Sequence, residues 1–112
     1  MKNLGDYSGA ALLDESIYGN HTNKGKIILE YYKNKKHTLQ KAKLKTFYGI
    51  TVVKKEYKEN EVSFEKSSIK EISTNENKIG NIIEMLKTYK VTPIALNDVL
   101  TDLLKTARFQ EN

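Results

Sequence analysis

Residues 42–53 read AKLKTFYGITVV, and this stretch shows a clear two-residue period. Its even positions are mostly apolar, whereas lysines occupy the odd positions 41, 43 and 45 at its start. Successive side chains of a β-strand point to opposite faces, so the pattern predicts a strand through Val53 with one lysine-rich face. Gly49 interrupts this strand and is a candidate for a β-bulge.

Two further strands flank this one in the sequence. The segment 26–33 (KIILEYYK) is a β-branched and aromatic run, and 61–66 (EVSFEK) alternates again after a polar turn at 58–61. The lysine-rich segment 34–38 is predicted to connect the first strand to the second. Together these segments predict three antiparallel strands.

The register of the last two strands has two interpretations. If Lys58 lies opposite Glu61, then Lys54 lies opposite Glu65, and both cross-strand pairs are complementary in charge. That register also places Lys55 beside apolar neighbours, and another register would move the faces. The sequence does not decide between these registers.

Beyond residue 73 the period changes to that of amphipathic helices. Ser73 and Glu76 fit a capping box at the start of a first helix that ends near Tyr89. Thr92 and Pro93 fit the cap and the first position of a second helix, and the short connection between the two predicts a helical hairpin. The apolar stripes expected to be buried are Ile79, Ile82, Ile83 and Leu86 in the first helix and Leu96, Val99, Leu100, Leu103 and Leu104 in the second.

Strands followed by helices, without βαβ alternation, predict an α+β fold. The expected architecture is a small antiparallel three-stranded sheet covered on one face by a C-terminal helical hairpin. A length of 112 residues suits one small domain, which we assign to residues 24–112. Residues 1–23 form a turn-rich N-terminal arm that we expect to be poorly ordered, with 8–17 as a candidate for one short helix.

The composition leaves little material for catalysis. There are no cysteines, which excludes disulfides, thiolate zinc sites and cysteine nucleophiles. His21 and His37 have no obvious carboxylate partner, and Asp98 and Asp102 share a helix face that we expect to be solvated. No phosphate-binding glycine loop and no serine nucleophile pattern is present. We therefore expect no enzyme, no metal site and no cofactor.

Apolar residues never form a long uninterrupted run in this chain. The longest run spans residues 10–13, far shorter than a membrane span or the core of a signal sequence. We therefore expect a cytoplasmic protein without a membrane partner.

The positive charge is concentrated in the middle of the chain. Residues 24–58 contain eleven lysines and two glutamates, a segment charge of +9, whereas 1–23 and 59–112 each carry −2, which gives the net charge of +5. Such a segment attracts acidic partners and makes association sensitive to salt. The lysine content is also consistent with the codon usage of an AT-rich genome.

The lysine-rich segment and the strand that follows it form the candidate partner-binding surface. Basic side chains alternate there with Phe47, and Tyr32 and Tyr57 are expected nearby. The predicted partner-binding residues are Lys33, Lys35, Lys36, Lys41, Lys43, Lys45, Phe47 and Lys55.

Two functions fit this surface. In the first, a non-catalytic regulatory protein docks an acidic protein partner through residues 33–58, for example as an inhibitor of a nucleic-acid-handling complex. In the second, the same surface binds single-stranded nucleic acid through phosphate attraction and base stacking. Eighteen of the nineteen basic residues are lysines, which disfavours sequence-specific base reading. The lysines also fit a simpler role in keeping a sheet edge soluble, and a homodimer through an uncovered edge stays open.

Two stretches resemble a family of small uncharacterised proteins from anaerobic spore-forming bacteria, known only as a domain of unknown function. They are FYGITVVKKE at 47–56 and VTPIALNDVLTDLL at 91–104, with SIKEIS at 68–73 between them. The motifs that carry the resemblance are Tyr48-Gly49-Ile50, Ile72-Ser73, Thr92-Pro93 and the acidic position Asp98. The resemblance leaves out the lysine-rich stretch 33–45 and the arm. It implies one β-then-α domain of bacterial origin and brings no activity, cofactor or catalytic residue.

Overall fold

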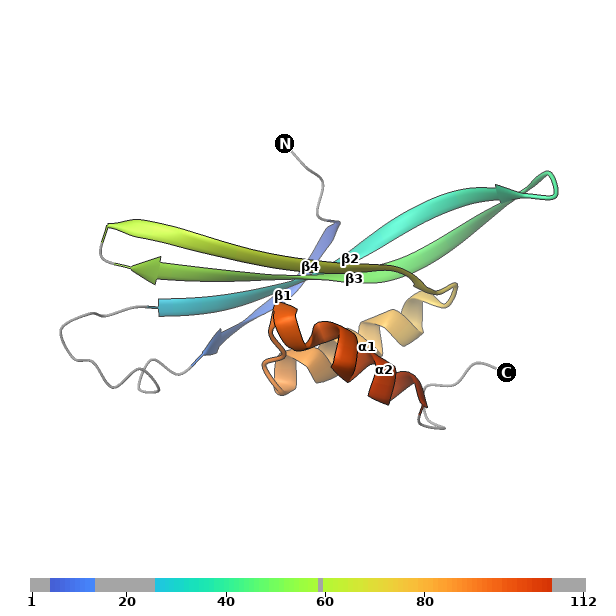
Figure 1. Ribbon diagram of the computed structural model, residues 1–112. Helices are drawn as coiled ribbons and strands as arrows, with labels where there is room; N and C mark the ends of the chain where they lie inside the picture. The colour runs from blue at the N-terminus through green and yellow to red at the C-terminus, as the bar shows by residue number, and fades with distance from the viewer. Residues whose placement is uncertain (1–4, 14–25, 59, 106–112) are drawn as a thin grey trace.

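The computed structural model describes residues 5–13, 26–58 and 60–105. They form a four-stranded antiparallel sheet, in the order β1-β2-β3-β4, with two helices packed against one face (Figure 1). The elements are β1 (Asp6–Leu13), β2 (Lys26–Gln40), β3 (Lys43–Lys58), β4 (Glu61–Ser73), α1 (Glu76–Thr88), the 3₁₀ turn η2 (Pro93–Ala95) and α2 (Leu96–Lys105). The α+β class and the C-terminal helices are confirmed, whereas the sheet has four strands instead of three.

The additional strand is β1, which lies in the segment predicted to be an arm. It pairs antiparallel with β2 between Asp6 and Leu13. The short helix expected at 8–17 is therefore wrong as far as Leu13, and its remaining residues lie outside the described part of the chain. Ala11 and Leu13 pack against the core from this strand, so pairing with β2 outweighs a modest helix propensity.

β2 and β3 form one long hairpin that projects beyond the helices (Figure 1). Their antiparallel register continues without interruption along the whole length of both strands. The segment 34–38 is part of β2, so its prediction as a connection is wrong. The actual turn, Lys41-Ala42, lacks the Asn, Asp or Gly that usually marks a two-residue hairpin, which is why the sequence did not reveal it.

β4 pairs with β3 in the charge-complementary register. Lys58 lies opposite Glu61, and Lys54 lies opposite Glu65. The Lys54 Nζ is 3.5 Å from a Glu65 carboxylate oxygen. This register also determines which β4 side chains share a face with those of β3, a point that the sequence left open.

Gly49 lies at a β-bulge, as predicted. The β3–β4 register shifts between Tyr48 and Ile50, and the additional residues are on β4 around Glu71, whose φ is 60°. A Cβ atom on Gly49 would overlap the carbonyl oxygen of Ile69. The close approach of β4 therefore requires a residue without a side chain at this position.

The core lies between the centre of the sheet and the inner faces of the helices. Tyr31 is fully buried, and its hydroxyl donates a 2.9 Å hydrogen bond to the Val91 carbonyl in the connection that follows α1. This bond joins the helical connection to the middle of β2 and gives a buried carbonyl its partner. The buried cluster consists of Leu29, Tyr31, Ile50, Val52, Ile79, Ile82, Ile83, Leu86, Val91, Leu96 and Leu100, with Val99, Leu103 and Leu104 packed against it.

The helices begin differently from the predicted caps. Asn75 caps α1 by accepting a 3.2 Å hydrogen bond from the Lys78 amide, and Ser73 accepts from the Asn75 amide, so the capping box on Ser73 is wrong. Thr92 makes no side-chain cap hydrogen bond, and Pro93 begins a 3₁₀ turn that leads into α2. Neither described helix is long and apolar enough to cross a membrane.

Replacing Gly49 by alanine is expected to destabilise the fold by about 2 kcal/mol or more, because the backbone of β4 would have to move. Gly80→Ala is the matched control. A Cβ on Gly80 meets nothing within 4 Å, so alanine there should stabilise α1 by about 0.5–1 kcal/mol. Urea denaturation followed by circular dichroism measures both variants. Similar small effects in the two would contradict the close approach at Gly49.

Stability is expected to fall at alkaline pH through Tyr31. Burial raises the pKa of its hydroxyl from 10.0 to about 12, so the folded state favours the protonated phenol. This contribution is complete below about pH 10 and is lost as the pH rises through about 12. Near neutral pH, Tyr31→Phe should be less stable than the native chain by about 1 kcal/mol. Urea denaturation of both chains at rising pH should show this difference shrinking; a constant difference would contradict the buried phenol.

Candidate functional site

The described helices cover one face of the sheet, and we call the other face, on which no helix of the described residues packs, the open face (Figure 1). Leu29 and Tyr31 of β2 and Ile50 and Val52 of β3 are buried under the helices. Because side chains alternate along paired strands, the even-numbered residues of β2 and the odd-numbered residues of β3 point to the open face. The pairing with β4 extends the open face to the even-numbered positions of that strand up to residue 68.

The open face carries lysines that acids do not balance. Its lysines are Lys26, Lys36, Lys43, Lys45, Lys55 and Lys66. Lys55 is paired with Glu30 at 3.1 Å, and Lys36 is paired with Glu71. Within the described residues, no acid forms an ion pair with the other four lysines. The other glutamates of β3 and β4 point to the opposite side of the sheet: Glu56, Glu61 and Glu65.

Aromatic side chains share the open face with these lysines. They are Tyr7, Tyr32, Phe47, Tyr57 and Phe64. Tyr7 and Phe64 are 60% and 64% exposed. The rings of Tyr7 and Tyr32 meet edge to face with centroids 5.7 Å apart, and the Lys45 Nζ lies 5.5 Å from the centre of the Phe47 ring. Exposed rings next to lysines are the combination that binds bases and phosphates together.

Polar contacts across the strands hold the middle of the open face in place. The Asn34 amide donates a 3.1 Å hydrogen bond to the Thr51 hydroxyl, which is 2.8 Å from the Ser68 hydroxyl, so one chain of contacts joins β2, β3 and β4. The Tyr32 hydroxyl donates a 2.8 Å hydrogen bond to Glu30. Burial, and then Glu30, raise the pKa of Tyr32 to about 12, so its hydroxyl stays protonated and can donate this hydrogen bond.

Four of the predicted partner-binding residues lie together. Lys36, Lys43, Lys45 and Phe47 occupy the open face at the projecting end of the β2–β3 hairpin. Lys55 is on the same face but toward the other end of β3, where Glu30 neutralises it. The predicted site is therefore one end of a longer surface.

The remaining predicted lysines lie elsewhere. Lys33 and Lys35 point to the helix side, where Lys33 pairs with Glu76 of α1. The hydrogen bond from Lys33, followed by its charge, holds the pKa of the Glu76 carboxyl below its ordinary value. Lys41 is in the turn. Tyr57, expected near the lysine-rich segment, lies at the far end of β3, so that expectation is wrong.

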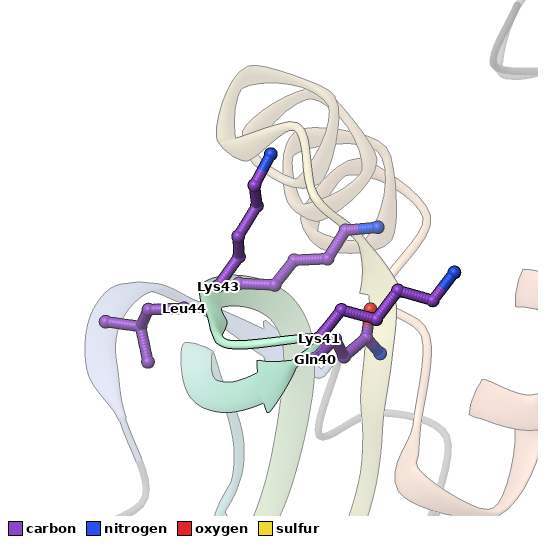
Figure 2. Close-up of a pocket in the computed structure, with 5 residues that line it drawn as sticks. Gln40, Lys41, Lys43 and Leu44 are labelled. Atoms are coloured by element: carbon purple, nitrogen blue, oxygen red, sulfur yellow. The ribbon is translucent and has the colours of Figure 1, made fainter.

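The end of the β2–β3 hairpin separates polar from apolar side chains. Gln40, Lys41 and Lys43 extend to one side, whereas Leu44 points the opposite way (Figure 2). Leu44 lies opposite Leu39 across the two strands, and these leucines are 70% and 73% exposed. The hairpin end therefore presents a basic side and a small apolar side.

Sequence reasoning missed several members of the open face. Tyr7 lies on the strand that was not predicted, and Lys26 was not assigned to the surface. The alternation in 61–66 indicated that Phe64 and Lys66 share a face, but only the β3–β4 register shows which face this is.

The histidine and carboxylate candidates lie apart from this surface. The described residues contain no group of three or more His, Cys, Asp or Glu side chains suited to a metal ion. The His37 Nδ1 is 2.8 Å from the Thr46 hydroxyl on the helix side of the hairpin, and His21 lies outside the described residues. Asp98 and Asp102 are exposed, as predicted.

These features define a small α+β protein with a basic, aromatic sheet face. The chain belongs to the Family of unknown function (DUF6514), whose model matches residues 12–106. The match confirms membership of an uncharacterised family, and it also includes the lysine-rich stretch 33–45 that the resemblance left out. No curated protein and no solved structure matches the chain.

Ala42→Gly is expected to stabilise the end of the hairpin locally by about 1 kcal/mol, because Ala42 has a φ of 65°, a conformation that glycine adopts without strain. Hydrogen exchange of the amides around the turn should slow, while global stability should change little because the turn lies outside the core. The control is Ala10→Gly in β1, where the backbone is extended and glycine should not stabilise. Unchanged exchange around the turn in Ala42→Gly would contradict the strained turn.

Proposed function

We propose that this protein is a non-catalytic binding protein that holds single-stranded nucleic acid on its open face. The observation that carries this proposal is the sorting of charge between the two faces of the sheet. Six lysines point to the open face, against two glutamates that reach them, whereas the other glutamates of β3 and β4 point away. The phosphate backbone of a single-stranded nucleic acid carries one negative charge per nucleotide, and it would meet a positive potential across this face.

The aromatic side chains supply the second part of the interaction. Phe47 lies beside Lys45, and Phe64 lies on β4 two residues from Lys66. Stacking of a base on an exposed ring contributes about 1–3 kcal/mol and tolerates any base. Lysines that bind phosphates and rings that bind bases thus alternate along the surface.

The geometry favours single strands over duplexes. A sheet face exposes rings in a plane, and only unstacked bases can lie against them. The open face extends about 50 Å along β3, which has 16 residues. The lysine-dominated composition adds charge without the planar guanidinium groups that recognise base edges, so binding should be tolerant of sequence.

An acidic protein partner is the second candidate, and one observation favours it. The hairpin end presents Leu39 and Leu44 on one side and lysines on the other. An apolar anchor bordered by charges suits a protein surface. Such a partner would make the protein a regulator, for example an inhibitor of a nucleic-acid-handling complex. For either candidate we propose a cytoplasmic protein of bacterial origin, from a spore-forming anaerobe.

The lysine prediction is tested by the salt dependence of binding. Fluorescence anisotropy of a labelled oligo(dT) of about 15 nucleotides should show binding that weakens steeply with salt, with weaker binding of the matching duplex. Lys43→Gln with Lys45→Gln should reduce the slope of log K against log salt by about 1.4, since each single-strand phosphate contact contributes about 0.7. The control removes two exposed lysines, Lys35 and Lys58, that point to the other side of the sheet. An equal effect of the control pair would contradict the open face as the binding surface.

The stacking prediction uses two phenylalanines of the open face, Phe64, which is exposed, and Phe47, which is half-buried. Phe64→Leu with Phe47→Leu should weaken oligo(dT) binding by at least about fivefold, equivalent to about 1 kcal/mol of lost stacking. Tyr89→Leu is the matched control, because Tyr89 is 71% exposed at the end of α1, on the helix side. Loss of binding with the lysine pair, but none with the phenylalanine pair, would favour the acidic protein partner. Absence of any binding at low salt would overturn the nucleic-acid proposal.

A further inference from the structure

β4 is an outer strand of the sheet, because the strand order ends with it. It is 13 residues long and pairs with β3 on one side only within the described residues. The main-chain groups on its outer side are therefore available to another extended segment. β1, the other outer strand, is shorter, with 8 residues and a bulge between Tyr7 and Gly9.

A groove runs beside the outer side of β4. It is lined by Glu65, Lys66 and Ser67 of the strand and by Pro93, Ile94 and Asn97 below it, and its volume is about 540 Å³. Ile94 is 89% exposed, more than any other large hydrophobic side chain in the described part of the chain. An edge strand beside an exposed aliphatic side chain is the arrangement that accepts an added β-strand.

The charges in the groove favour an acidic residue in that strand. The Glu65 carboxylate is 3.5 Å from Lys54, whereas no acid is paired with Lys66 among the described residues. A residue added opposite Lys66 would point to the open face, as Lys66 does, and its two neighbours would point down toward Pro93 and Ile94. The complementary segment therefore has an acidic residue between two aliphatic residues.

A second copy of the chain fits this groove poorly. A two-fold pairing of β4 with itself, centred on the groove at Lys66, would place Lys66 against its own copy and Glu61 opposite Glu71. Like charges directly opposite each other are destabilising. With the two-fold axis at Lys66, the charges therefore favour a segment of a different protein over a second copy.

We propose that the outer side of β4 binds an extended aliphatic–acidic–aliphatic segment of a partner protein as a fifth strand. Main-chain hydrogen bonds to β4 hold the segment, Ile94 and Pro93 contact its aliphatic side chains, and Lys66 pairs with its acid. The groove differs from the proposed nucleic-acid surface because it includes Ile94 and Pro93. The peptide proposal does not depend on whether the open face binds nucleic acid.

The test is a titration of the ¹⁵N-labelled full-length chain, without nucleic acid, with the synthetic peptide acetyl-Ser-Thr-Ile-Glu-Val-Thr-Ser-amide. NMR should show saturable shifts confined to the groove amides, including those of Lys66 and Ile94, and slower hydrogen exchange along β4. The same peptide N-methylated at its three central residues should not bind, because added strands depend on main-chain hydrogen bonds. No saturation by about 1 mM peptide, or shifts spread over the chain, would overturn the proposal.

Two variants test the side-chain contacts. Ile94→Ser should weaken binding about tenfold, whereas Tyr89→Ser, which changes an exposed ring outside the groove, should leave it unchanged. Lys66→Glu should reverse the charge preference, so that a peptide with Lys in place of its Glu binds better than the original. Equal binding of both peptides to Lys66→Glu would overturn the assignment of Lys66.

The oligomeric state separates this proposal from self-association. Sedimentation should show a monomer that peptide binding does not change. A dimer with β4 amides protected from exchange in the absence of peptide would overturn the proposal, because a second copy would then cover the edge.

Discussion

The two helices are too short to cover the sheet on which they pack. β2 and β3 have 15 and 16 residues, about 50 Å of extended chain, whereas α1 has 13 residues, about 20 Å of helix. The helices therefore bury only the middle of one face, around Tyr31 and its hydrogen bond to Val91. This difference in length between strands and helices leaves the hairpin end and the opposite face without a covering helix among the described residues. These parts of the sheet must therefore be stable in contact with water.

The sheet meets this constraint in different ways along its length. In the middle of the open face, Asn34, Thr51 and Ser68 are hydrogen-bonded across three strands. Toward the hairpin end, lysines occupy the open face, and β pairing is joined by the contact between His37 and Thr46 on the helix side. Among the described residues, the charges of β4 and the bulge near Gly49 protect the outer side of this strand. A chain with one buried centre thus presents two surfaces, a basic aromatic face and an open edge.

Much of this architecture could be predicted from local patterns. The alternation in 42–53 and the helical stripes agree with the structure, and of the registers that the sequence left open the structure has the one that pairs Lys54 with Glu65. β1 was missed because its residues have no strong local preference and become a strand only against β2. The turn at Lys41-Ala42 was missed because neither residue is typical of a position with positive φ. Half of the candidate site was found because lysines at alternate positions in one strand necessarily share a face.

The sequence by itself determined the class of fold and the location of the charge, since both depend on the period and the type of side chains along one segment. Only the tertiary structure decided which lysines share a face. Lys33 and Lys36 are three residues apart in one strand, yet they lie on opposite faces, the first against α1 and the second beside Phe47. The exposure of Ile94 beside the edge of β4 was likewise decided by packing. The open face and the groove are each formed by segments that are distant in the sequence. How these segments align depends on the packing of the whole core.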